Sequence, residues 1–129
     1  MKKFISKIFN KNDNEKKFKE LILPKINAYQ KSIETKESLS FLHYGHLGDI
    51  IDSLSTVKEI AKKKKCNFYI QKNKTIPSHL SSKEHPFGNN YLSEKSINKI
   101  LPLLKNQNYL NKVELYDNKN IDIDLNFFR

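Results

Sequence analysis

Cysteine is almost absent from this sequence, which contains Cys66 alone and no tryptophan. A single thiol excludes an internal disulfide framework and is typical of a protein in a reducing compartment. No apolar run approaches the roughly 18 residues that a membrane-spanning helix needs. The start, Met1–Phe9, is charged but lacks the continuous apolar segment of a signal peptide. We therefore expect a cytoplasmic protein without a transmembrane helix.

Arginine is also scarce, because 24 residues are basic and only Arg129 among them is not a lysine. The formal net charge of +10 raises the question of nucleic-acid binding. Lysine, however, lacks the planar fork with which arginine binds bases and phosphates, so we expect no specific nucleic-acid partner. A solvated basic face is the favoured interpretation, and an anionic membrane surface or a phosphate ligand are the alternatives.

Residues 1–37 are predicted to form a helical amino-terminal extension. A polar segment at 10–14 reads as a short linker. Apolar side chains then recur at helical spacing, at Phe18, Ile22, Ile26, Tyr29 and Ile33. Pro24 lies inside this pattern and is expected to kink the helix or to divide it in two.

Residues 38–129 alternate between strand and helix patterns. The strand patterns fall at 39–44, 67–71, 112–116 and 121–125, and the helix patterns at 50–61 and 93–106. Ser93 is expected to cap the second helix and Pro102 to break it, and residues 73–90 are expected to form a long loop. Strands that alternate with helices indicate βαβ units. The predicted fold class is therefore α/β, a Rossmann-like parallel sheet with flanking helices.

The turn from Gly45 to Asp49 follows the first predicted strand. In open parallel sheets, ligands bind beyond the carboxyl ends of the strands, near the point where the strand order reverses. Glycines let the backbone bend sharply there, and the following helix presents N–H groups to an anion. Neither the dinucleotide-binding spacing of glycines nor a P-loop is present. The turn thus predicts a ligand site without naming the ligand.

Asp49 has two interpretations. It precedes the apolar stripe of the helix, where aspartate is a favoured cap, and Asp52 three residues later completes a loose capping arrangement. Alternatively, its carboxylate is a general base that takes a proton from a sugar hydroxyl. The residues alone favour the cap.

The segment Gly45–Lys58 resembles the amino-terminal signature of heptosyltransferase-type glycosyltransferases (family 9-like). Members show Gly-Asp, two apolar residues, a polar or aromatic residue, a small residue, then Leu-Pro. Gly48 and Asp49 match the Gly-Asp pair, Ser55 stands in place of the proline, and Asp52 stands where tyrosine or histidine is more usual. The remaining positions that conform are Ile50, Ile51, Ser53 and Leu54. Two later stretches, 101–110 and 121–129, are similar to stretches of predicted glycosyltransferase-like proteins, in the same order.

This resemblance implies a bacterial enzyme of the GT-B architecture, in which two Rossmann-like domains face each other across a cleft. The chain would be the incomplete acceptor-side domain (38–129), with the donor-binding domain absent. The implied activity is transfer of a sugar from a nucleotide-sugar to a saccharide acceptor, with no other cofactor, at the inner face of the membrane. Asp49 would be the base of an inverting transfer, and the implied acceptor-binding residues are Gly45, His46, Gly48 and Asp52.

Two other functions stay open at this point: a non-catalytic saccharide- or phosphate-binding module, and a basic protein that associates with RNA or membranes. No metal site is expected, because His43 and His46 have no suitably spaced third ligand. Asp122 and Asp124 share one face of a strand. A solvent-facing strand is favoured for them over a carboxylate pair for glycoside hydrolysis.

Overall fold

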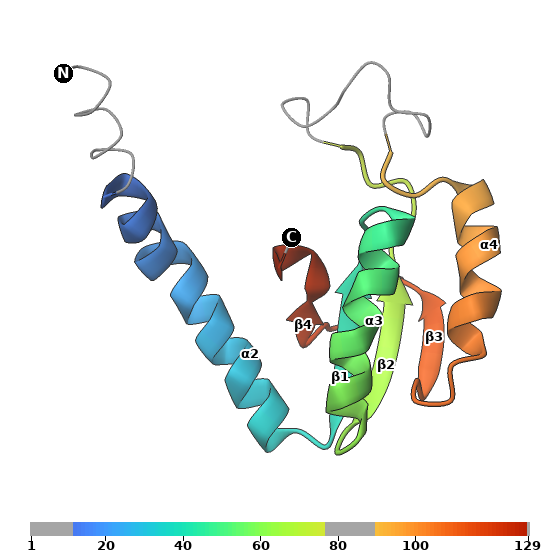
Figure 1. The fold of residues 1–129 in the computed structure, drawn as a ribbon, viewed down its shortest axis with the longest axis horizontal. Helices are drawn as coiled ribbons and strands as arrows, with labels where there is room; N and C mark the ends of the chain where they lie inside the picture. The colour runs from blue at the N-terminus through green and yellow to red at the C-terminus, as the bar shows by residue number, and fades with distance from the viewer. Residues whose placement is uncertain (1–11, 77–89, 129) are drawn as a thin grey trace. The chain divides into compact units, whose positions relative to one another are not determined.

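The structure is a computed structural model that describes residues 12–76 and 90–128 (Figure 1). It divides into two compact units, Met1–Thr35 and Lys36–Arg129. The described part of the first unit is helical, and the second unit contains the sheet. Among the described residues, no helix is both long enough and apolar enough to cross a membrane.

The described part of the first unit is one continuous helical run from residue 12 to 35. It includes a π-helical turn, η1 (Phe18–Ile22), followed by α2 (Leu23–Thr35). The N–H of Leu23 donates to the carbonyl of Phe18, five residues earlier. This wider turn stands directly before Pro24, whose ring crowds the preceding turn and which has no N–H to donate. Pro24 was expected to kink the helix or to divide it in two. The helix is not divided, and a π turn accommodates the proline.

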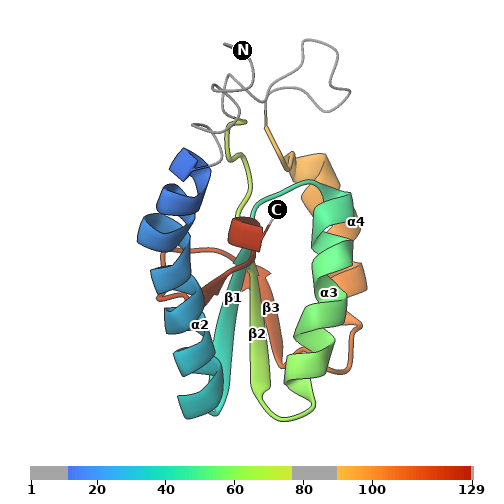
Figure 2. The same ribbon diagram turned by 60° about the vertical axis from the view of Figure 1, so that its left-hand side comes forward.

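The second unit is built on a four-stranded sheet in the order β3-β2-β1-β4, with every pair of neighbours parallel. The strands are β1 (Ser38–His43), β2 (Lys65–Ile70), β3 (Lys112–Leu115) and β4 (Ile123–Asp124). Helices α3 (Leu47–Ala61) and α4 (Glu94–Lys105) cover the same face of this sheet (Figure 2). The predicted α/β, Rossmann-like class is confirmed.

The core lies between the sheet and these two helices. Cys66 of β2 points to the helix side, since its Sγ lies 4.0 Å from the carbonyl of Val57 in α3. Residues at alternate positions share this face. The fully buried apolar side chains here include Leu39, Phe41, Phe68, Ile70, Ile50, Val57 and Leu104. Each contributes roughly 1.5–3 kcal/mol when removed from water, so this layer holds the unit together.

The connection from β3 to β4 crosses the opposite face of the sheet without a helix. Lys119, within this connection, places its ammonium 5.8 Å from the ring centre of Tyr69, a residue that alternates with the helix-facing positions of β2. β3 and β4 are separated by three strand spacings, roughly 14 Å. Both strands are short, so an extended link over 116–122 spans this distance where longer parallel strands need a helical crossover.

Two helix predictions have different outcomes at α4. The hydroxyl of Ser93 accepts a bond of 3.2 Å from the N–H of Ser96, so the predicted cap is confirmed. Pro102 was expected to break the helix, but α4 continues past it to Lys105. Proline removes the donor to the carbonyl of Asn98. Both residues are exposed, so the loss of this bond falls on the solvent side of α4.

The last predicted strand, at 121–125, is shorter than expected. Only Ile123 and Asp124 pair with β1, and a 3₁₀ helix, η2 (Leu125–Phe128), follows at once. The predicted long loop at 73–90 lies mostly outside the described residues. Its two ends meet in an antiparallel bridge between Thr75 and Asn90.

Candidate functional site

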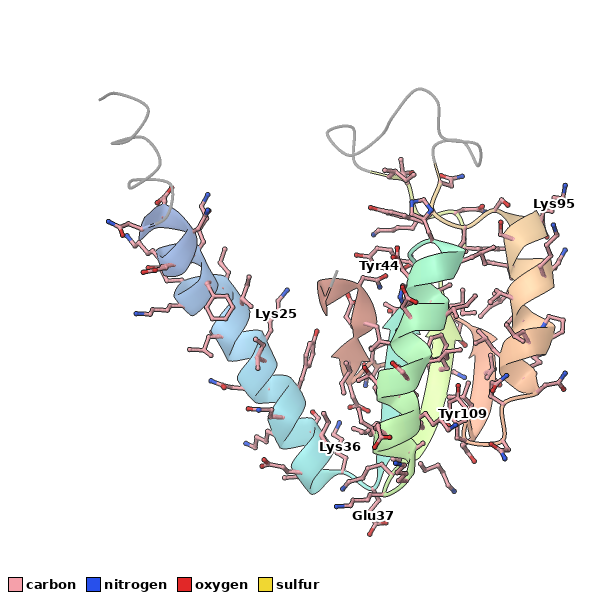
Figure 3. All side chains as sticks on the ribbon, in the orientation of Figure 1. Lys25, Lys36, Glu37, Tyr44, Lys95 and Tyr109 are labelled. Atoms are coloured by element: carbon pink, nitrogen blue, oxygen red, sulfur yellow. The ribbon has the colours of Figure 1, made fainter. Side chains whose placement is uncertain are left out.

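The turn between β1 and α3 lies where the strand order reverses. β2 and β3 lie on one side of β1, and β4 lies on the other. In open α/β sheets this switch point is where a crevice forms beyond the strand ends. Figure 3 shows Tyr44, the first residue of the turn, at the end of β1 beside the start of α3. Residues 44–46 thus form the connection at the place where the sequence predicted a ligand site, whereas residues 47–49 of the predicted turn belong to α3.

Side chains from within and beyond the turn fix its backbone. The N–H of Gly45 donates to Nδ1 of the buried His43 over 2.9 Å. The N–H of Tyr44 donates to Oδ1 of Asn126 over 3.0 Å. Asn126 is itself held by the carboxylate of Asp124, which accepts from its backbone N–H at 2.9 Å and its side-chain Nδ2 at 2.7 Å. β4 and η2 therefore brace the turn from the far side of the switch point.

α3 begins earlier than the sequence suggested. His46 is the N-cap, with extended φ and ψ of −66° and 162°, and its side chain accepts no capping bond. Its carbonyl accepts the N–H of Ile50 at 3.1 Å. Asp49 consequently lies in the first helical turn, and the prediction that it caps the helix is wrong. A carboxylate in a first turn is stabilised by the partial positive charge of the helix end.

An aromatic cluster stands beside this turn, and the sequence did not predict it. The rings of His46 and Tyr91 meet edge to face, with centres 5.0 Å apart and planes at 67°. The ring of Tyr44 lies 5.9 Å from that of Tyr91, tilted by 50°. The ammonium of Lys74 lies 5.3 Å from the centre of the Tyr44 ring. Such aromatic and cation–π geometries stabilise the arrangement by roughly 0.5–1.5 kcal/mol per pair.

Backbone pairing brings Lys74 and Tyr91 to this place from opposite ends of the 73–90 segment. The N–H of Tyr91 donates to the carbonyl of Lys74, and the N–H of Asn73 to that of Leu92, each at 3.0 Å. Asn73 adopts a left-handed φ of 58°, a conformation that asparagine tolerates better than most residues. This pairing joins residues that are far apart in the chain, so local sequence patterns did not predict it.

The other predicted acceptor-binding residues lie around the turn in different surroundings. Gly45 is buried in the turn, whereas Asp52 is exposed on α3. Gly48 is helical and exposed, and a Cβ built on it meets no atom within 4 Å. The structure therefore gives no steric reason for a glycine at position 48. The open space beside it leaves the start of α3 accessible.

Asp122 and Asp124 do not simply face solvent, as the favoured interpretation expected, because both carboxylates are engaged in hydrogen bonds. The carboxylate of Asp122 accepts the N–H of Ser40 at 2.9 Å and pairs with Lys36. Asp124 holds Asn126, as described above. Both side chains are half-buried and bond to backbone groups, so they fix β4 and η2 beside β1.

Neither thiol nor metal chemistry has support in the described residues. Cys66 is buried, and its burial raises the pKa of the thiol to about 11. A thiol with so high a pKa is a poor nucleophile at neutral pH. Within residues 12–76 and 90–128, no group of three or more histidine, cysteine or acidic side chains is placed to hold a metal ion.

Comparisons with known proteins give no relative for this chain: no family model, no curated protein and no solved structure matches it. The fold and the site therefore stand on the chain's own residues.

Proposed function

We propose that this chain binds a saccharide at the β1–α3 turn and is the acceptor side of a glycosyltransfer from a nucleotide-sugar. One observation supports this most directly. The half-buried Asp49, in the first turn of α3, shares the switch point of the sheet with the half-exposed rings of Tyr44 and His46. A carboxylate beside aromatic rings suits a ligand that has both hydroxyl groups and apolar C–H faces.

The rings supply the binding part of this function. Small-molecule sites combine aromatic surface with a few polar groups that fix orientation. Tyr44 and His46 each offer a flat apolar body with a polar tip, and the buried Tyr91 holds both rings in place. A sugar ring can lie on such a surface while its hydroxyl groups bond to the polar tips.

Asp49 supplies the chemical part. As the acceptor hydroxyl oxygen forms its bond to the anomeric carbon of the donor, the bond from that carbon to the nucleotide phosphate breaks. The hydroxyl proton passes to the carboxylate of Asp49, and the configuration of the anomeric carbon inverts. General bases of this kind contribute roughly 10²–10⁴-fold to a rate.

The first test is a titration followed by backbone amide NMR shifts, with short saccharides in one series and nucleotide-sugars in another. Saccharides are expected to shift the signals of Gly45, His46 and Gly48. A well-dispersed spectrum in which no saccharide moves these signals at millimolar concentration would refute the proposal.

The second test is Asp49→Asn, with Glu59→Gln as a matched control because it removes a charge from the exposed far end of the same helix. The Asn variant should bind saccharide as the unchanged chain does, and any transfer that the chain supports from a panel of nucleotide-sugars should fall by roughly 10²–10⁴-fold. The control should leave that transfer unchanged. Transfer that persists at full rate in Asp49→Asn would overturn the role of Asp49 and leave the second candidate function, a non-catalytic saccharide-binding module, for which the aromatic cluster alone suffices.

A further inference from the structure

Lys74 is the lysine that lies over the ring of Tyr44, at the β1–α3 turn. Lys36, Lys62, Lys112 and Lys119 each lie within 4.0 Å of a carboxylate. Among the residues that the structure describes, Lys74 forms no ion pair, although it is exposed on the ligand side of the sheet. Its ammonium is held instead over the face of Tyr44. A cation without a carboxylate partner retains its full attraction for an incoming anion.

The backbone of Lys74 is fixed in this place. Its carbonyl accepts the N–H of Tyr91, the neighbouring Thr75 pairs with Asn90, and Asn73 makes the left-handed turn that precedes it. Tyr91 in turn contacts both Tyr44 and His46. Lys74 and the two half-exposed rings are thus parts of one surface. Fixing a cation in advance lowers the entropy lost when a ligand binds it.

We propose that Lys74 determines the specificity of this site, and that the saccharide it accepts carries an anionic group, a phosphate or a carboxylate. The Lys74 ammonium binds the anionic group while the sugar ring contacts Tyr44 and His46. This inference rests on the proposed function, because it concerns the ligand of the same turn. Asp49 disfavours an anion close to its carboxylate, so the anionic group lies on the Lys74 side and a neutral hydroxyl faces Asp49.

The test uses the full chain and matched sugars. Glucose, galactose and mannose are each titrated as the neutral sugar, the 6-phosphate and the uronic acid, with inorganic phosphate as a further probe. NMR shifts of Gly45, His46 and Lys74 report binding. At least one charged form should bind about tenfold or more tightly than its neutral parent, in line with the strength of hydrogen bonds to charged groups. The order of phosphate and uronate identifies the anionic group.

Three variants assign this preference to one side chain. Lys74→Gln should reduce the affinity for the charged sugar to that for the neutral one, and Lys74→Arg should retain most of it. Lys95→Gln removes the same charge from the exposed start of α4 (Figure 3) and should change neither affinity. Because Lys74 is exposed, Lys74→Gln is expected to keep the dispersed spectrum of the folded chain.

The outcomes separate this inference from the proposed function. Equal affinities for charged and neutral sugars, with shifts at the turn, would overturn the role of Lys74 and leave saccharide binding intact. Equal losses in Lys74→Gln and Lys95→Gln would overturn it too, since they would indicate a general charge effect. Inorganic phosphate that binds as tightly as a sugar phosphate would also overturn the inference, because the sugar ring would then contribute nothing to binding. If no sugar shifts the turn, the proposed function fails and this inference fails with it.

Discussion

α3 and α4 begin at equivalent places in two successive βα units, yet their first residues are held by different means. α4 begins at a local cap, since the Ser93 hydroxyl accepts the N–H of Ser96. α3 begins at His46, whose side chain accepts no capping bond. The approach to α3 is fixed by the ring of the nearby His43 and, from a distant part of the chain, by Asn126. A serine or aspartate cap is worth about 1 kcal/mol, so the α3 start forgoes stability that the α4 start has.

This difference indicates what each helix start is for. The α4 start is a structural cap that Ser93 and Ser96 form without help from distant residues. The α3 start places a histidine ring, not a capping oxygen, against Tyr91 at the switch point of the sheet. Residues that contribute less to stability than the best alternative are common at functional sites. The comparison can be tested by disturbing each start in turn.

The largest effect on stability is expected from Asn126→Ala. This change leaves the backbone N–H of Tyr44 without its Asn126 acceptor in a part-buried place. The cost in the free energy of unfolding should be about 1–3 kcal/mol, measured from urea denaturation. Hydrogen exchange at the Tyr44 amide should accelerate as well. Asn120→Ala, at an exposed position in the β3–β4 connection, should stay within about 0.5 kcal/mol. Equal effects of the two changes would mean that the distant brace is unimportant.

Ser93→Ala should have the next largest effect. It removes the acceptor for the Ser96 N–H at the start of α4, and the free energy of unfolding should fall by about 1 kcal/mol. Ser93→Asp restores a capping oxygen and should recover most of this loss. Saccharide affinity at the β1–α3 turn should not change in either variant. A loss of affinity would show that the two helix starts are coupled and that the α4 cap is not purely structural.

The two starts also differ in how far the sequence predicts them. Ser93 precedes an apolar stripe with a strong capping side chain, and the cap it predicted is confirmed. Asp49 carries an equally strong local signal, but the chain turns into the helix at His46, three residues earlier. The bonds that fix this entry come partly from Asn126, 82 positions along the chain from Tyr44. Local patterns do not contain such a contact, so the cap was assigned to the wrong residue.

The fold and the site differ in the same way, because local patterns predict the fold and distant contacts form the site. The short, mainly apolar runs of β1 and β2, and the stripes of α3 and α4, are local patterns, and they predicted the parallel sheet. The aromatic cluster depends on the bridge between Thr75 and Asn90, which no periodicity records. Lys74 and Tyr91 were therefore missed, although their positions at the two ends of a long polar segment were a usable signal. Long loops in compact domains are often functional.

The smallest effect on stability is expected from His46→Ser. This substitution also tests the comparison of the two helix starts most directly. Serine gives α3 the capping oxygen that α4 already has, which is worth about 1 kcal/mol. The same change removes the ring that packs against Tyr91, a contact of similar size, so the free energy of unfolding should change little while saccharide affinity falls. His46→Gln removes the ring without supplying a good cap, so it should lose the same affinity and be less stable than His46→Ser by about 1 kcal/mol. The decisive result is this difference in stability between two variants that bind saccharide equally weakly. If stability and affinity rise together, His46 was not retained for its ring, and the α3 start is only a poorer version of the α4 start.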